Sequence, residues 1–75
     1  MPDLMNVSDL KQGEQRTVSH FTDPRLEGKL LCLGVKPGCA VELVRRTTFS
    51  STLYIKVADS RLAIRRREAA CIELR

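Results

Sequence analysis

The 75-residue sequence is short of the groups on which most enzyme chemistry depends. It has no tryptophan, one tyrosine and a single histidine, His20. No Gly-x-x-x-x-Gly-Lys loop is present to hold a phosphate, and no serine lies in a Gly-x-Ser-x-Gly setting. A nucleophile with its base, or two converging carboxylates, is the minimum for catalysis. We therefore expect no enzymatic activity from this chain alone.

Long apolar runs and a cysteine framework are also missing. No run approaches the roughly 18 residues that cross a bilayer, and the N-terminus lacks the basic and apolar regions of a secretory signal. Cys32, Cys39 and Cys71 are odd in number and form no Cys-x-x-Cys, which disfavours disulfides and structural zinc. We expect a cytoplasmic protein with buried, unreactive cysteines, Cys32 among the leucines of a helix.

The residues that are present fit one small aliphatic domain covering residues 1–75. Hydrophobic residues make up 43% of the chain and charged residues 29%, which is typical of a globular protein and argues against disorder. No repeat, low-complexity tract or change of composition marks an internal boundary.

The clearest local signals surround a predicted helix over about residues 23–33. Asp23-Pro24 is a typical helix start, because aspartate caps free N–H groups and proline suits the first helical position. The core-facing stripe of this helix is predicted to be Leu26, Leu30 and Leu33. Gly34 suits the left-handed residue that ends a helix, and Pro37-Gly38 suits the centre of a type II turn.

Alternating apolar and polar residues predict five short strands. They cover Glu14–Phe21, Cys39–Arg45, Leu53–Val57, Arg61–Arg65 and Cys71–Leu74. The last two links are short enough for antiparallel turns, and Glu68-Ala69-Ala70 has the composition of one helical turn. Five strands around an aliphatic core, with one helix after the first strand, indicate a mainly β, closed or nearly closed barrel.

Positive charge is concentrated in the second half of the chain. Residues 1–44 carry five Lys and Arg against six Asp and Glu, whereas residues 45–75 carry eight against three. The basic half could meet nucleic acid, anionic lipid or an acidic protein surface, or it could be a solvated strand face. No aromatic residues interleave its arginines along the sequence, as a base-stacking platform requires.

Four segments, in their order and spacing, resemble those of one family. They are Val7–Glu14, Leu30–Gly38, Val41–Arg46 and Leu62–Ala69. From about Val7 to Leu74 the chain resembles the FeoA family, small cytosolic proteins that accompany the bacterial ferrous-iron transporter FeoB. The resemblance implies an SH3-like β-barrel, a fold that the C-terminal domains of DtxR-type iron-dependent repressors share.

The resemblance also implies a function. A family member would be a non-enzymatic adaptor without a cofactor, docking on the cytosolic part of FeoB and affecting its transport or GTPase cycle. It would be cytoplasmic, and peripheral to the inner membrane through FeoB. We expect the contacts to come from exposed loops and the basic strand face, at Arg45, Arg46, Phe49, Arg65, Arg66 and Arg67.

The connection between the second and third predicted strands departs from the family pattern. Many members have a Gly-Asp-Pro-containing connection there, whereas this chain has Thr47-Thr48-Phe49-Ser50-Ser51-Thr52. Phe49 at such a tip either exposes apolar area that anchors an interface or folds back over the mouth of the barrel. The shape of the tip, and any partner contact there, is therefore left open by the sequence.

Two alternatives to the adaptor remain, a nucleic-acid-associated or regulatory domain and a weak metal carrier, and self-association is a separate question. The basic half fits a nucleic-acid-associated or regulatory domain like the DtxR C-terminal domain, with binding that weakens steeply with salt. A weak, adventitious divalent-metal site could form around His20 and Asp23, with Glu27 nearby, although iron sites of the oxygenase type use two histidines and a carboxylate; otherwise His20 is a plain strand residue. A small barrel could also form a homo-oligomer through a strand edge.

Overall fold

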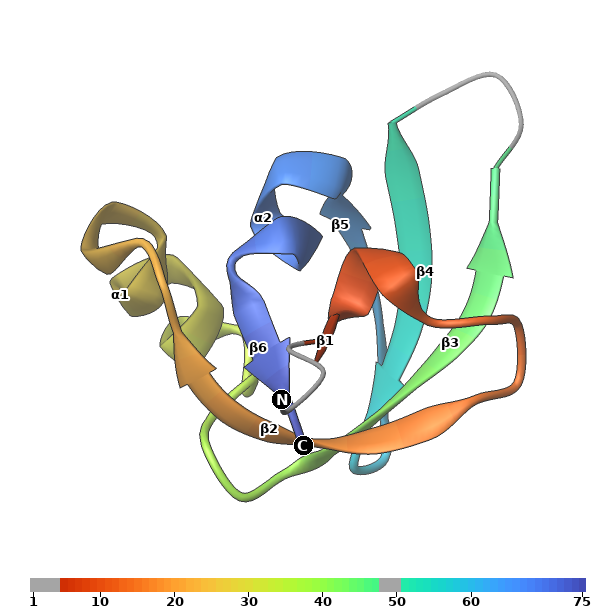
Figure 1. The fold of residues 1–75 in the computed structure, drawn as a ribbon, viewed down its shortest axis with the longest axis horizontal. Coiled ribbons are helices and arrows are strands. Elements are labelled where there is room, and N and C mark those ends of the chain that lie inside the picture. The colour runs from red at the N-terminus through yellow and green to blue at the C-terminus, as the bar shows by residue number, and fades with distance from the viewer. Residues whose placement is uncertain (1–4, 48–50) are drawn as a thin grey trace.

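The computed structural model describes residues 5–47 and 51–75, and within them six strands form one antiparallel sheet in the order β1-β6-β2-β3-β4-β5 (Figure 1). The strands are β1 (Met5–Asn6), β2 (Gln15–Phe21), β3 (Ala40–Arg46), β4 (Thr52–Val57), β5 (Ser60–Arg65) and β6 (Ile72–Leu74). The remaining elements are the 3₁₀ turn η1 (Val7–Asp9) and the helices α1 (Pro24–Cys32) and α2 (Arg66–Ala70). The mainly β barrel with one inserted helix is confirmed.

The five predicted strands are all present, and the elements that the sequence did not predict are the shortest ones. β1 contains two residues and η1 three, too few to show an alternation or a helical stripe. β1 pairs with β6 by placing Met5 opposite Leu74 and Asn6 opposite Glu73. β1 therefore forms one edge of the sheet, beside the C-terminal strand β6.

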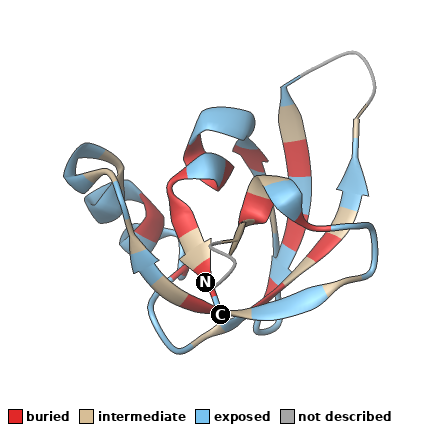
Figure 2. Cartoon of the chain, viewed as in Figure 1, coloured by how far each residue is buried: buried red, intermediate tan, exposed pale blue. Residues whose placement is uncertain are grey.

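The core is aliphatic and follows the predicted alternation. Leu53, Ile55 and Val57 of β4 are buried, whereas Tyr54 and Lys56 between them are exposed (Figure 2). The residues opposite them on β3 and β5 belong to the same buried layer; these are Val41, Leu43 and Ile64. No helix within the described residues is long and apolar enough to cross a membrane.

Helix α1 ends as the sequence predicts. Gly34 has φ +95°, its N–H donates to the Leu31 carbonyl at 3.0 Å, and the Val35 N–H donates to the Leu30 carbonyl at 2.9 Å. This pair of bonds is the Schellman closure, which needs a left-handed residue after the helix. The following Pro37-Gly38 turn is also confirmed, since Gly38 has φ +92°.

The start of α1 is confirmed as well, but its predicted core stripe is only partly right. The Asp23 side chain accepts the N–H of Arg25 at 2.9 Å, as expected for an N-cap. Leu30 is fully buried and Leu26 is partly buried against the core, but Leu33 is 37% exposed. The reason is the position of Leu33 in the closing turn: the chain reverses there, and Val35 reaches the core instead.

The cysteines differ in burial. The prediction that Cys32 is buried is wrong: it is exposed, because two residues along a helix turn it about 200° away from the buried Leu30. Cys39 is partly buried and packs against the core, and Cys71 is buried. All three thiols are free.

A buried carboxylate connects the two helices. Among the described residues, Glu68 of α2 is the only polar or charged side chain that is buried, at 3% exposure. One of its oxygens accepts the backbone N–H of Arg65 at 2.8 Å, and the other accepts the ammonium group of Lys29 on α1 at 2.5 Å. Glu68 therefore fixes the turn from β5 into α2 and ties α1 to the barrel.

Candidate functional site

The arginines that the sequence analysis selected lie at one end of the sheet, where β3 ends, β4 begins and β5 leads into α2. Arg46 lies opposite Leu53, and Thr52 lies opposite Arg65. The N–H of Arg66 also donates to the Ser51 carbonyl at 2.7 Å, so the return from the β3–β4 connection meets the start of α2. Segments 20 residues apart in the chain are thus brought together. We call four exposed arginines of this region the basic end: Arg45, Arg65, Arg66 and Arg67. Arg46 is exposed as well, but its side chain is bonded to backbone carbonyls near η1.

A β-bulge exchanges the faces on which the two neighbouring arginines of β3 lie. The β3–β4 register changes by one residue around Val44, between the Leu43–Ile55 and Arg45–Tyr54 pairs. Residues directly opposite each other in an antiparallel pair share a face of the sheet. Arg45 therefore shares the outer face with exposed Tyr54, whereas the next residue, Arg46, lies opposite the buried Leu53 at the end of β3, where it remains exposed.

The side chain of Arg46, although exposed, is bonded to the protein's own backbone. Its Nη2 atom donates to the Ser8 carbonyl at 3.0 Å and to the Leu10 carbonyl at 2.6 Å. These carbonyls end the η1 turn, so the guanidinium closes this end of the barrel. A role for Arg46 in partner binding stays a prediction. Phe49, the remaining residue of the predicted set, lies outside the described residues.

The outer face holds an exposed aromatic residue that the sequence reasoning did not select. Tyr54 is 42% exposed and lines a shallow hollow on β3, β4 and β5. We call this hollow the Tyr54 surface; its lining residues are Val44, Arg45, Tyr54, Ile55 and Arg61. The sequence did contain a sign of this exposure: the only tyrosine alternates with apolar residues in a predicted strand, which places it on the outward face. Arg61 gave no such signal, because its place beside Tyr54 depends on the β4–β5 register.

The arginines of α2 line a second hollow next to Ser51 and Ala70. Within the described chain, Arg66 and Arg67 form no ion pair, whereas Arg16 pairs with Glu14 and Arg25 with Asp23. The charge of this region is therefore left without an internal counter-ion. An anionic partner could supply one.

The titratable groups with shifted pKa values serve structure. Burial acts to raise the pKa of Glu68, but the hydrogen bonds from Lys29 and from the Arg65 N–H outweigh it and lower the pKa. The backbone N–H of Arg25, followed by its guanidinium, lowers the pKa of the Asp23 cap. Burial, assisted by the negative charge of Asp23, raises the pKa of the Cys71 thiol, which keeps it in the unreactive neutral form.

The predicted metal ligands are not brought together. In the described part of the chain, no group of three His, Cys, Asp or Glu side chains could hold a metal ion. His20 is exposed, and its Nδ1 lies 3.1 Å from the Ser19 hydroxyl. The Asp23 carboxylate is engaged with Arg25.

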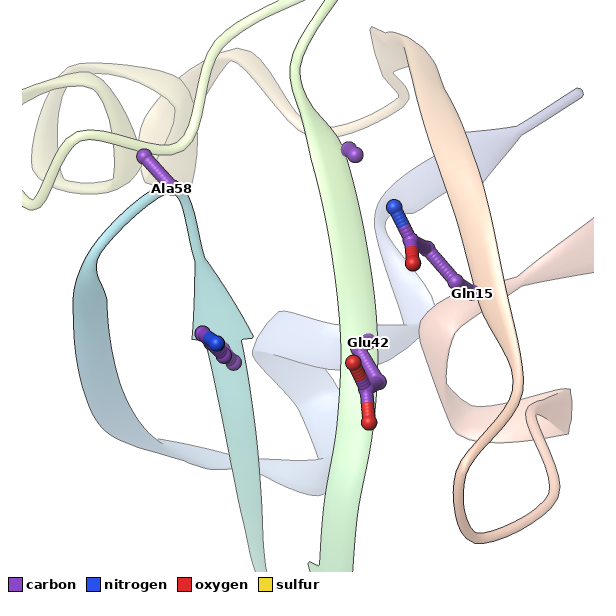
Figure 3. A pocket seen from close by; sticks show the side chains of 5 residues that line it. Gln15, Glu42 and Ala58 are labelled. Atoms are coloured by element: carbon purple, nitrogen blue, oxygen red, sulfur yellow. The ribbon is translucent and has the colours of Figure 1, made fainter.

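Another hollow crosses β2, β3 and the β4–β5 turn and is polar rather than basic (Figure 3). Gln15, Glu42 and Lys56 lie opposite one another on the three strands, with Ala58 at the turn. The side chains of this row include one carboxylate and one ammonium group, and no hydroxyl, thiol or imidazole. Lys56 joins this row to the Tyr54 surface, since it lies opposite Glu42 on one side and opposite Arg61 on the other.

The sheet order, the short strands and the inserted helix define an SH3-like barrel domain. A family model described as the FeoA domain matches residues 5–75. The chain belongs to the FeoA family, as its sequence segments suggested. Comparison with curated proteins gives no match.

Solved structures agree with this assignment. An iron uptake regulatory protein, FeoA, is 20% identical with a TM-score of 0.84, over 99% of this chain and 97% of the other. Stenotrophomonas maltophilia FeoA, solved with zinc and described as a prokaryotic SH3 domain protein, is 23% identical with a TM-score of 0.81, over 95% and 89%. A manganese-dependent transcriptional repressor is 14% identical with a TM-score of 0.86; the match spans 99% of this chain but only 42% of the repressor. At these identities the likeness concerns the fold.

Proposed function

We propose that this protein is an accessory factor of ferrous iron transport that docks on the cytosolic part of FeoB and modulates its transport or GTPase cycle. Membership of the FeoA family supports the link to iron transport. The Stenotrophomonas maltophilia relative is itself described in terms of activating bacterial ferrous iron transport. On this proposal the protein is cytoplasmic and reaches the inner membrane through its partner.

The observation that carries the proposal is the basic end. Its arginines come from β3, β5 and α2 and surround the base of the β3–β4 connection. Arginine is over-represented at protein interfaces, where its planar guanidinium pairs with carboxylates. The protein would act by binding, with no chemistry and no cofactor of its own. The proposed contacts are Arg45, Arg46, Phe49, Arg65, Arg66 and Arg67.

The test is a calorimetric titration of the metal-free protein into the cytosolic GTPase region of FeoB, with and without a GTP analogue. We expect saturable binding that weakens when Arg66 and Arg67 are both replaced by glutamate. The matched control is Lys36→Glu with Arg75→Glu, which makes the same change of net charge at exposed positions outside the basic end. Absence of binding both with and without the GTP analogue would contradict docking on this region.

Phe49→Ala tests the β3–β4 connection separately. We expect this variant to fold normally and to bind FeoB more weakly, because an exposed aromatic side chain can anchor an interface. Circular dichroism checks the fold, and the same titration measures the affinity. If the variant binds as tightly as the parent, this side chain takes no part in docking.

A second candidate function is a regulatory domain associated with nucleic acid. The likeness to the manganese-dependent repressor and the position of Tyr54 beside two arginines favour it. Such binding depends on counterion release, so the logarithm of the affinity falls linearly with the logarithm of salt concentration. Fluorescence anisotropy with labelled single- and double-stranded DNA at low salt provides the test, and undetectable binding there would exclude this function.

A further inference from the structure

The Tyr54 surface differs from the rest of the outer sheet face in combining an exposed aromatic ring with two arginines. Arg45 lies directly opposite Tyr54 on β3. On β5, Ala63 lies opposite Tyr54, and Arg61 is two residues before it on the same face. Opposite side chains in a sheet are about 5 Å apart at Cβ, and diagonal ones about 7–8 Å. Both guanidinium groups are therefore within reach of a ligand seated on the ring.

The charges of these two arginines are not satisfied by the protein. In the part of the chain that the structure describes, neither Arg45 nor Arg61 forms an ion pair or a side-chain hydrogen bond. Arg46, one residue further along β3, makes two bonds to backbone carbonyls. The bulge at Val44 thus places Arg45 on the outer face without an internal partner and Arg46 where it can bond to backbone carbonyls.

We propose that the Tyr54 surface binds an acidic segment of the protein partner, with a carboxylate held between Arg45 and Arg61 and an adjacent apolar side chain packed on the Tyr54 ring. This inference rests on the proposed function, since it names the chemistry of the FeoB segment that docks. Tyrosine and arginine are enriched among the residues that dominate binding energy at protein interfaces. The half-buried Val44 adds an apolar contact to the hollow.

A protein segment fits this surface better than a nucleic acid strand. A strand needs a continuous basic track for its phosphates and aromatic residues for successive bases. Here one ring is available, and the neighbouring row contains the Glu42 carboxylate between Gln15 and Lys56 (Figure 3). Glu42 would repel a phosphate backbone continuing across the sheet. A short segment with one or two carboxylates occupies only the basic part.

The first experiment compares two doubly charge-reversed proteins in the titration with the cytosolic region of FeoB. R45E/R61E changes the proposed site. K36E/R75E changes two exposed cations near the other end of β3: Arg75, whose backbone pairs with Thr17, and Lys36, in the turn whose Gly38 N–H donates to Val18. Both take the net charge from +4 to zero. We expect R45E/R61E to weaken binding at least tenfold and K36E/R75E to weaken it less than threefold. R45Q/R61Q replaces the first variant if its circular dichroism shows misfolding.

The second experiment identifies the occupant. Replacing Tyr54 with the photo-crosslinker p-benzoylphenylalanine, at a position that is 42% exposed, places a reactive ketone on the surface. After irradiation of the complex, mass spectrometry should find the crosslink in a segment of FeoB rich in Asp and Glu. A crosslink to a neutral or basic segment would overturn the proposed chemistry.

The outcomes separate the two proposals. Equal weakening by R45E/R61E and K36E/R75E, with the parent protein still binding, overturns this site and leaves docking on FeoB intact. Failure of the parent protein to bind FeoB in any nucleotide state overturns both. Binding of single-stranded DNA that is lost in R45E/R61E alone, without FeoB binding, assigns the Tyr54 surface to nucleic acid instead.

Discussion

Removal of the Glu68 carboxylate should destabilise the protein more than any other exchange of a charged side chain. Glu68 is 3% exposed, and both of its oxygens are bonded, one to the Arg65 N–H and the other to Lys29. In Glu68→Ala the Arg65 N–H at the start of α2 loses its acceptor and the Lys29 ammonium loses its counter-ion. The contact between the two helices is lost with them.

The magnitude follows from the two bonds. A hydrogen bond to a charged group contributes about 1.5–3 kcal/mol. The Lys29 side chain is 57% exposed, so the ion pair itself is screened and adds about 0.5 kcal/mol. We therefore expect Glu68→Ala to lower the free energy of unfolding by about 2–3 kcal/mol, or roughly 10–20 °C in Tm for a domain of this size. Lys29→Met should cost a comparable amount, because it leaves the buried Glu68 carboxylate without its counter-ion.

The pH dependence gives an independent check. The pKa of Glu68 is lower in the folded protein than its ordinary value of 4.5, so folding favours the ionised carboxylate. Its stabilising contribution is complete above that ordinary value and disappears as the pH falls through the lowered folded pKa. The difference in stability between the parent protein and Glu68→Ala should therefore shrink below pH 4.5.

Urea and thermal unfolding followed by far-ultraviolet circular dichroism, at pH 7 and at acidic pH, measure both effects. Glu68→Gln keeps the shape of the side chain and one acceptor for the Arg65 N–H, so it should fall between the parent and the alanine variant. A Glu68→Ala protein that melts within about 2 °C of the parent at pH 7 would show that neither bond contributes as reasoned here.

Three further predictions concern the backbone and the bulge, each measured as a change of Tm by circular dichroism. Gly34→Val should destabilise by about 1–2 kcal/mol or more, because φ is +95° while no atom within 4 Å obstructs a Cβ there; unchanged melting would contradict the closure of α1. Ala58→Gly should stabilise by about 0.5–1 kcal/mol, because this alanine has φ +54°, and a lower Tm would refute that reading. Arg46→Met should cost about 1–2 kcal/mol and Arg45→Met less than about 0.5, and equal effects would mean that the bulge does not separate their roles.

Local chemistry made much of the fold predictable. Asp23-Pro24 and Gly34 mark the ends of α1, because few residue types can cap the free N–H groups at its start or adopt the positive φ that closes it. The strand Thr52–Val57 is equally clear, since one face is buried and the other exposed throughout. Leu33 shows the limit of such patterns: its spacing is helical, but the chain reverses at the next residue.

The candidate site was less predictable because it depends on register. Simple alternation puts Arg45 on the same face as Val41 and Leu43, yet the bulge at Val44 moves it to the outer face and places Arg46 opposite Leu53, where it bonds to the Leu10 carbonyl. A bulge is one extra residue in one strand, and nothing in the β3 sequence alone fixes its place. Arg61 reaches the side of Tyr54 only through pairing between β4 and β5.

The distribution of ion pairs argues for a partner of opposite charge. Near α1 and β2 the chain balances its own cations: Arg16, Arg25 and Lys29 each pair with a carboxylate. On the outer face of β3–β5 and on α2, by contrast, Arg45, Arg61, Arg66 and Arg67 form no ion pair within the described residues. Like charges gathered in this way repel a second copy of the same surface, which disfavours self-association through it. They attract a carboxylate-bearing segment of another protein, the occupant that the charge-reversal experiment is designed to detect.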